Sequence, residues 1–321
     1  MNRKLIGLAI LSIATVTLGS CQRSRAFKQD QEYYKDDASY YNKPAAGVTQ
    51  KVAAMGQPKK RVSILNFWND TPVRQNDMGL FAADELRRGL YATQRLIIPM
   101  DSKVEAKTDD FVHGDEIKVA QLIREGRREG VAAIVIGRVT KVVFRQRGDE
   151  VGVLRQMQSL VGVDVEMKLF DVAGGREVIA TAKSGEAASN AMVALETSSL
   201  QSPEFRSEMT KTAIRNAVSQ LVPDVIKAIE KMQWEGHVAK ILGNKIYVNA
   251  GKQSGLVAGD ILKVLTQGDD IYDPSTGAYL GRSRGQLKGT LEIVDFIGTD
   301  GAVSETHTGG NFAEGDSVQL Y

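Results

Sequence analysis

The chain has 321 residues, of which 42% are apolar and 25% are charged, a composition typical of a globular protein with room for two domains. It carries 41 Lys and Arg residues against 39 Asp and Glu residues, so its charge gives no indication of a nucleic-acid partner, which requires a basic surface. After the N-terminal segment, no apolar run of 18 or more residues occurs, so we expect no membrane-spanning helix in the body of the protein.

The first 20 residues have the pattern of a secretory signal peptide. Arg3 and Lys4 give a basic start, and the apolar stretch 5–18 that follows is too short for a membrane span of about 20 residues. The stretch ends in Leu18-Gly19-Ser20-Cys21, after which the sequence is polar at once. We therefore expect export across the inner membrane.

The four residues that end in Cys21 resemble the lipobox of bacterial lipoproteins. In that family the peptide is cut just before the cysteine, which carries a diacylglyceryl group on its sulfur and a further acyl chain, such as palmitate, on the new amine. The resemblance implies cleavage between Ser20 and Cys21 and a lipid anchor on Cys21. With Gln22 rather than Asp at the next position, it also implies the periplasmic face of the outer membrane.

The cysteine count favours the same interpretation. Cys21 is the single cysteine of the chain, so no internal disulfide can form, and an odd cysteine in a secreted protein needs an explanation. Lipidation supplies that explanation. The alternative is an ordinary signal peptide followed by a chance cysteine.

Residues 21–60 are predicted to be a lipid-anchored flexible tether. They are polar, include Pro44 and Pro58, and show no apolar periodicity. As a coil, the segment would hold its ends roughly 35 Å apart. Four tyrosines interrupt it: Tyr33, Tyr34, Tyr40 and Tyr41. The alternative is therefore a segment that becomes ordered against a neighbouring subunit or another partner.

Residues 61–233 are predicted to form an α/β domain. The mostly apolar run 62–67 is typical of a buried strand, and 96–99 of a second strand. Between them a helix is expected to begin near Asn76 or Asp77. Its apolar positions, at helical spacing, are Met78, Phe81, Ala82, Leu86 and Leu90.

A second helix is predicted to open at Asp115-Glu116 and to end near Gly130. Its apolar face comprises Val119, Leu122 and Ile123. The continuous apolar run 131–137 is typical of a strand that is covered on both faces. Residues 139–144 are predicted to be a strand that leaves the core.

Apolar and polar residues alternate strictly over 161–169, and a second strand is expected at 177–183 after a glycine turn. This pattern predicts an antiparallel hairpin with one solvent-exposed face. Ser202 and Pro203 fit the cap and first position of a long helix. Apolar residues recur every four positions along it, and a bend is expected at Pro223. With this helix across the sheet, the predicted fold class is α+β, a mixed-sheet α/β layer.

The runs Val-Ser-Ile-Leu-Asn-Phe at 62–67 and Gly-Val-Ala-Ala-Ile-Val-Ile-Gly at 130–137, together with the hairpin, resemble the curli-secretion lipoprotein family (CsgG). They also resemble the middle domain of the flagellar assembly protein T family (FlgT). The resemblance covers residues 60–232 and includes no chemical motif. It implies a homo-oligomeric ring.

In the curli family each subunit inserts two long hairpins into the outer membrane, and the corresponding segments here are 142–160 and 184–202. The first segment contains Arg145, Arg147, Asp149, Glu150 and Arg155. Each Arg at the bilayer centre would cost about 2–4 kcal/mol. The second segment is small and polar. We therefore expect a soluble version of the domain, with an oligomeric export pore as the alternative.

Residues 234–321 predict a small, SH3-like β-barrel of five or six short strands. Gly243-Asn244 is typical of a tight hairpin turn, and the Gly-Asp pairs at 259–260 and 315–316 repeat one turn pattern. Asp-Pro-Ser-Thr-Gly at 273–277 is a further turn. These motifs resemble the C-terminal domain of the flagellar assembly protein T family.

No catalytic or cofactor-binding motif is present in the sequence, and neither His237 nor His307 lies in a ligand-spaced motif. His113 is surrounded by acidic residues, which we interpret as a solvated loop. These residues are Asp109, Asp110, Asp115 and Glu116. A second acidic group lacks the spacing of a calcium loop. Its members are Asp269, Asp270 and Asp273.

The sequence therefore predicts a non-enzymatic, outer-membrane-anchored periplasmic lipoprotein without cofactor or metal. Its expected role is that of a structural or assembly component of an envelope machine, a ring of the flagellar-basal-body or secretion-channel kind. Its expected partners are the membrane, further copies of the chain and other proteins of that machine, with no nucleic acid. The alternatives are a curli-type oligomeric export pore and a metal-binding or hydrolytic periplasmic protein that uses the His113 loop.

Overall fold

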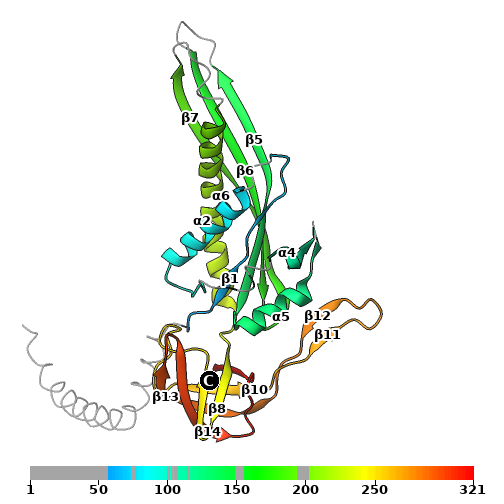
Figure 1. Ribbon diagram of the computed structural model, residues 1–321, viewed down its shortest axis with the longest axis vertical. Coiled ribbons are helices and arrows are strands. Elements are labelled where there is room, and N and C mark those ends of the chain that lie inside the picture. The colour runs from blue at the N-terminus through cyan, green and yellow to red at the C-terminus, as the bar shows by residue number, and fades with distance from the viewer. Residues whose placement is uncertain are drawn as a thin grey trace, which may run out of the picture. The chain divides into compact units, whose positions relative to one another are not determined.

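The computed structural model describes residues 57–73, 77–99, 102, 104, 108–113, 116–148, 155–193 and 202–321. The chain divides into two units, Met1–Gly56 and Gln57–Tyr321, and every described residue belongs to the second unit. This unit contains a mixed α/β layer followed by a closed β-barrel (Figure 1). None of the helices in the described ranges combines the length and the apolar character needed to cross a membrane.

The sheet of the α/β layer is mixed, as the sequence predicts. β1 (Val62–Ile64) and the short β2 (Trp68–Asn69) both pair in parallel with β5 (Ala133–Gly148). β6 (Arg155–Asp171) and β7 (Arg176–Val193) continue the sheet with antiparallel pairing. The sheet order β1-β5-β6-β7 leaves β7 at one edge.

Helices cover both faces of this sheet. α2 (Met78–Ala92) and α6 (Pro203–Lys231) pack on the face that includes Val135. α5 (Val119–Glu129) packs on the opposite face, in a cluster with Ile134. Successive side chains of a strand point to opposite faces, so the continuous apolar run in β5 supplies both cores.

α6 begins as the sequence predicts. The Ser202 hydroxyl accepts a hydrogen bond from the Phe205 N–H at 3.1 Å, and Pro203 is the first helical residue. The helix is continuous over 29 residues and contains Pro223. It packs against β6 and β7, and it thereby covers the hairpin (Figure 1).

The prediction of a strand at residues 96–99 was wrong. Ile97 makes an isolated bridge with Arg61, in which the Val62 N–H donates to the Ile97 carbonyl at 2.9 Å and the Ile97 N–H to the Lys60 carbonyl at 3.0 Å. Pro99 has no N–H group to donate, so the backbone pairing with the segment around Arg61 cannot continue at Pro99.

The predicted start of the second helix was also wrong. Glu116 belongs to β4 (Glu116–Ile117), which pairs with β3 (Val112–His113) just after the short α4 (Thr108–Phe111). The Lys118 N–H donates to the Phe111 carbonyl at 2.9 Å and holds this small hairpin together. α5 therefore begins only at Val119, and it ends as predicted at Gly130, which has φ 68°.

β5, β6 and β7 are longer than the apolar pattern predicts, with 16, 17 and 18 residues. Arg147 pairs with Gln158, and Gln158 with Asn190, so the strands continue in register through the polar segments. Residues 184–193 belong to β7 and pair with β6, so the described part of the segment 184–202 continues this sheet. Residues 149–154 and 194–201 lie outside the described part.

The C-terminal region forms the predicted barrel, closed by six strands in the order β10-β13-β14-β9-β8-β15. The strands are β8 (Gly236–Leu242), β9 (Lys245–Val248), β10 (Ile261–Leu265), β13 (Leu287–Ile297), β14 (Gly301–Gly309) and β15 (Ser317–Leu320). Gly243, at φ 61°, makes the predicted tight turn between β8 and β9. β11 (Asp270–Tyr272) and β12 (Tyr279–Arg282) form a separate two-stranded ribbon that the sequence did not predict.

The two Gly-Asp turns of the barrel have the same geometry. Gly259 and Gly315 adopt φ of 90° and 89°, a conformation that favours glycine. Each following aspartate accepts a hydrogen bond from the N–H three residues before it, at 2.8 Å for Asp260 and 2.7 Å for Asp316. The repeated Gly-Asp sequence therefore corresponds to a repeated turn just before β10 and β15.

We expect Asp316→Ala to destabilise the barrel more than Asp260→Ala. Each variant loses the turn hydrogen bond, at about 1 kcal/mol. Asp316 also accepts two hydrogen bonds from Lys288 Nζ, at 2.7 and 2.8 Å, and its side chain is only 6% exposed. Its removal leaves an unpaired, half-buried ammonium, which should cost about 2 kcal/mol more. Urea unfolding followed by circular dichroism measures both losses, and equal losses would contradict this assignment.

Candidate functional site

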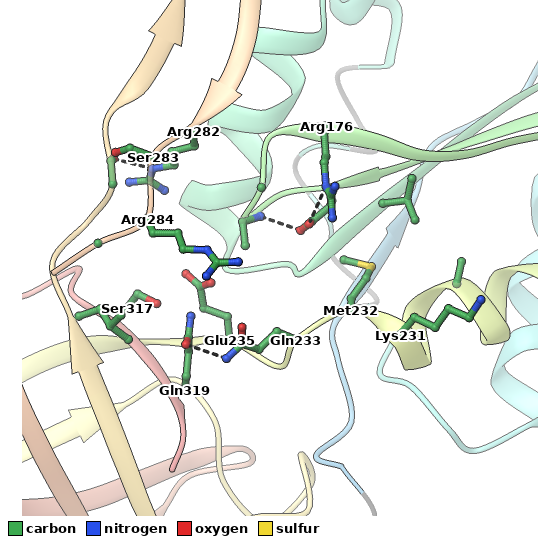
Figure 2. A pocket seen from close by; sticks show the side chains of 18 of the residues that line it. Arg176, Lys231, Met232, Gln233, Glu235, Arg282, Ser283, Arg284, Ser317 and Gln319 are labelled. Atoms are coloured by element: carbon green, nitrogen blue, oxygen red, sulfur yellow. Dashed lines mark hydrogen bonds and ion pairs between the residues drawn. The ribbon is translucent and has the colours of Figure 1, made fainter. Parts of the chain in front are cut away.

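A groove of 1250 Å³ lies between the α/β layer and the barrel (Figure 2). The outer edge of β7 near Ala180 and the last turns of α6 form one wall. Strands β10 and β15 and the segment that follows β12 form the other wall. The connection between the two domains, which includes Gln233 and Glu235, also lines the groove.

Basic side chains outnumber acidic ones along this groove. The basic residues are Arg176, Lys227, Lys231, Lys263, Arg282 and Arg284, and the acidic ones are Asp171, Asp224 and Glu235. Two of the acids already face cations. An oxygen of Asp224 lies 2.9 Å from Lys183 Nζ, and one of Asp171 lies 4.0 Å from Arg176 Nε. The groove therefore has an excess of positive charge.

Three of the basic side chains are exposed and unpaired. Lys227, Lys231 and Arg284 make no hydrogen bond or ion pair with any residue for which the structure gives a position. Figure 2 shows that Arg284 and Glu235 both point into the groove, while Lys231 belongs to the last turn of α6. The cations thus stand on both walls, with their charge available to a ligand.

The wall of the barrel is fixed to the α/β layer by a buried carboxylate. Arg61 Nη2 lies 2.9 Å from an oxygen of Asp300, whose side chain is 6% exposed. Asp300 also accepts the N–H groups of Gly251 and Ser254, at 2.8 and 2.9 Å, and the Ser254 hydroxyl at 2.6 Å. Burial by itself would raise the pKa of Asp300, but these hydrogen bonds lower it below its usual value.

A second ion pair joins the β11–β12 ribbon to α5. Arg127 donates to the two oxygens of Asp270 at 2.7 and 3.5 Å. Burial acts to raise the pKa of Asp270, but the hydrogen bond and charge of Arg127 lower it below the usual value. At the same place the Tyr279 ring of β12 contacts Gly175 so closely that a Cβ would overlap it. These contacts fix the ribbon against the β6–β7 turn.

His237 is a neutral group that lines the groove. Burial lowers the pKa of His237, while Glu235 raises it and the charges of Arg282 and Arg127 lower it further. The distance from His237 Nε2 to the nearest oxygen of Glu235 is 3.9 Å. Since the net shift is downward, this imidazole adds no positive charge to the groove at pH 7.

α6 covers part of the open edge of β7 with amide side chains. Asn216 Nδ2 donates to the Glu186 carbonyl at 2.8 Å, and Gln220 Nε2 donates to the Ser184 carbonyl at 2.9 Å. Both carbonyls therefore point away from β6. This part of the sheet edge has its backbone acceptors satisfied within the chain.

The neighbouring part of the same edge is open. Ala180 and Ala182 share the register of Ser184 without a bulge, so their N–H and C=O groups also point away from β6. Both alanines are exposed, and neither backbone makes an outward hydrogen bond to a residue within the described ranges. Ala180 lines the groove, which therefore contains an unpaired strand edge beside the free cations.

The structure leaves the His113 loop undecided. Asp115 lies outside the described residues, and for Asp109 and His113 only the backbone is described. Within the described ranges, no group of three His, Cys, Asp or Glu side chains could hold a metal ion. The metal-binding or hydrolytic alternative stays a hypothesis.

The second acidic group makes structural contacts. Asp270 binds Arg127, and Asp273 accepts the N–H groups of Ser275 and Thr276 at 2.7 and 3.0 Å. The hydrogen bonds from these two backbone groups lower the pKa of Asp273 below its usual value. Asp273 therefore closes the predicted turn between β11 and β12.

Ser20 and Cys21, the predicted cleavage and lipidation site, lie in the unit Met1–Gly56, outside the described residues. The signal peptide and the tether lie there too. These assignments stay predictions.

The groove could not be predicted from the sequence, because its residues come from distant parts of the chain. Lys227 and Lys231 lie one turn apart on α6, and Arg282-Ser283-Arg284 is a short basic run that begins at the last residue of β12. Each pattern alone is typical of a solvated surface. The basic run was the available signal, but only the fold brings it opposite the end of α6.

These features define an α+β protein in which a mixed, helix-covered sheet precedes a closed six-stranded barrel. No protein-family model matches the chain, and no curated protein is similar to it. The resemblance to the curli-secretion and flagellar assembly families therefore stays a prediction.

Several solved structures are remotely similar. They include the hypothetical protein CT253 from Chlamydia trachomatis, at 12% identity over 54% of this chain and 96% of that chain, with a TM-score of 0.33. Lipoprotein GNA1162 from Neisseria meningitidis has 14% identity over 54% and 99%, with a TM-score of 0.30. The PelC dodecamer from Paraburkholderia phytofirmans has 17% identity over 56% and 93%, with a TM-score of 0.28. At these TM-scores the similarity supports no conclusion about fold or function.

Proposed function

We propose that the protein is a lipoprotein of the outer membrane whose periplasmic body is a structural or assembly component of an envelope machine. One observation carries the proposal, the sequence Leu18-Gly19-Ser20-Cys21 after a basic start and a short apolar stretch. The lone cysteine of the chain stands at the position that such a lipid anchor requires. Two acyl chains already anchor a protein stably.

What supports an assembly role is the way in which the two domains of the body are joined. The ion pairs of Arg61 with Asp300 and of Arg127 with Asp270 connect them at separate places. A body with two such connections presents its surfaces in a fixed relation, as a ring subunit requires. Native mass spectrometry of the full chain in detergent tests the ring, which should give a single closed oligomer.

We expect Cys21→Ala to abolish lipid attachment. Cells supplied with radiolabelled palmitate should label the wild-type chain and leave the variant unlabelled, because the acceptor sulfur and the cleavage that exposes the new amine are both lost. Ser24→Ala, just outside the four-residue motif, is the matched control and should keep the label. Label on Cys21→Ala, or an unmodified mass for the mature wild-type chain, would refute the lipoprotein assignment.

An export pore is the second candidate, and the length of β5, β6 and β7 favours it. Strands of 16 to 18 residues exceed the roughly 9–11 that cross an outer membrane. The register weighs against it, since Arg145 falls on one face of the sheet and the Ser159–Ser189 pair on the other. A pore should conduct in planar bilayers when the full chain is added, and a scaffold should not.

A further inference from the structure

We infer that the groove binds an extended, acidic peptide segment of a partner protein, which adds as a strand to the open edge of β7 beside Ala180 and Ala182. This inference goes beyond the proposed role at the membrane and does not depend on lipid at Cys21. The lipid anchor and the binding of a peptide can therefore be refuted independently.

The outer edge of β7 is covered at one end and open at the other. Glu186 and Ser184 have their outward carbonyls covered by Asn216 and Gln220 of α6. The same edge is open from Ala182 toward the groove. An exposed strand edge is a template for another strand, and chains that leave one uncovered commonly use it for peptide binding.

The open stretch of β7 is long enough to pair with a short peptide. A bulge at Val178 ends the regular register on one side, and Gln220 ends the uncovered stretch at Ser184 on the other. Between these limits about five residues of a peptide can pair, a span of about 17 Å. The groove of 1250 Å³ gives such a segment space between β7 and the barrel.

Positive charge lies beside this open edge. Lys227 and Lys231 follow one another on α6, and Arg284 stands on the barrel wall (Figure 2). Among the described residues, the one side chain within ion-pair distance of Glu235 is His237, whose pKa is lowered, so Glu235 offsets part of the positive charge but leaves the excess of cations. A peptide with carboxylates at alternate positions would meet these cations, and a basic peptide would be repelled.

Backbone pairing favours a peptide over other polyanions. A sulfated polysaccharide or a phosphate would use Lys227, Lys231 and Arg284 but would leave the N–H and C=O groups of Ala180 and Ala182 unpaired. An extended peptide satisfies both sets of groups at once. Binding of a peptide to the β7 edge therefore requires the N–H groups of the peptide backbone, whereas binding of another polyanion does not.

The test uses the whole protein, extracted from membranes in detergent, and a fluorescein-labelled ten-residue peptide of alternating Glu and Thr. Binding is measured by fluorescence anisotropy. The double variant Lys227→Glu, Lys231→Glu should bind the peptide at least about tenfold more weakly, since two favourable charges become repulsive. The matched control Lys141→Glu, Lys245→Glu makes the same change at exposed positions away from the groove. It should bind like the wild type.

A second peptide isolates the strand pairing. N-methylation of its six central residues removes the N–H groups and keeps every carboxylate, so its affinity should fall at least about tenfold. Equal binding by the methylated peptide, or full displacement by dextran sulfate at equal charge concentration, would make the groove a general polyanion surface and overturn the inference. Equal binding by the Lys227→Glu, Lys231→Glu variant would overturn it too. If the chain self-associates and the peptide disrupts that association, the edge binds a second copy of the chain. That result would also overturn the inference.

Discussion

Replacement of Gly185 by alanine is expected to destabilise the protein by about 3 kcal/mol or more. Gly185 lies on β7 directly beneath α6, and a Cβ there would overlap the Ala213 carbonyl oxygen and the Ala217 nitrogen. It would also lie 2.9 Å from the Ala217 Cα. Because these neighbours are helix backbone, no side-chain rotation relieves the overlap. α6 must move off the sheet, which would break the hydrogen bonds of Asn216 and Gln220.

Gly162→Ala is the matched control for this prediction. Gly162 lies on the adjacent strand β6, where it pairs with Glu186, and a Cβ there would meet no atom within 4 Å. Chemical unfolding followed by circular dichroism should show a large drop in the midpoint for Gly185→Ala and a small change for Gly162→Ala. Similar midpoints for the two variants would mean that α6 does not lie this close to β7.

The parts of the fold that the sequence predicted correctly are those with a local signal. Residues 161–169 alternate because each side chain of β6 points to the opposite face from the last, and that period is readable in the sequence. Ser202 and Pro203 mark a helix start through their own backbone chemistry. The repeated Gly-Asp turns depend on a glycine φ and a hydrogen bond within three residues.

The parts that the sequence did not predict depend on contacts between distant segments. Residues 145–148 carry no apolar pattern, yet they continue the predicted strand because β6 offers a pairing partner through Met157. Ile97 forms a β-bridge because the fold brings the distant residue Arg61 beside it. The groove is the same case, since Arg284 and Lys231 are 53 residues apart in the chain and face one space. Pairing of this kind has no signature within a short window of sequence.

Asp300 connects the two domains through several hydrogen bonds, a role that its position in the sequence does not predict. It follows Thr299 in a tight turn between β13 and β14, where an aspartate is common for turn chemistry alone. In the structure its carboxylate accepts from Arg61, Gly251 and Ser254 while the side chain is 6% exposed. Its charge therefore organises three segments, one of which belongs to the other domain.

Asp300→Ala is expected to cost about 3 kcal/mol of stability, because it leaves a guanidinium and several N–H and O–H donors without their acceptor. Asp295→Ala is the matched control. Asp295 lies on the same hairpin and is exposed, and within the described part of the chain its side chain accepts only the N–H of Phe296. The measurement is the midpoint of urea unfolding at pH 7. A loss for Asp300→Ala no greater than that for Asp295→Ala would show that the domains are held together by other contacts.

The pKa of Asp300 also predicts how stability changes with pH. It is lowered in the folded protein, since the hydrogen bonds from Ser254, Arg61 and Gly251 outweigh the effect of burial, whereas the unfolded chain should titrate near about 3.9. The unfolded state therefore binds the proton first as the pH falls. The contribution of Asp300 is complete above the unfolded pKa and is lost as the pH falls through the folded one.

Unfolding free energies measured from pH 7 down to about pH 3 should consequently fall less steeply for Asp300→Asn than for the wild type. The amide keeps the shape of the carboxylate and cannot titrate, so the difference between the two slopes isolates this one group. Asp270 and Glu314, whose pKa values are also lowered, contribute equally to both proteins and cancel. Parallel slopes would place the folded pKa of Asp300 at its unfolded value, and the carboxylate would then not be the charged centre of the contact between the domains.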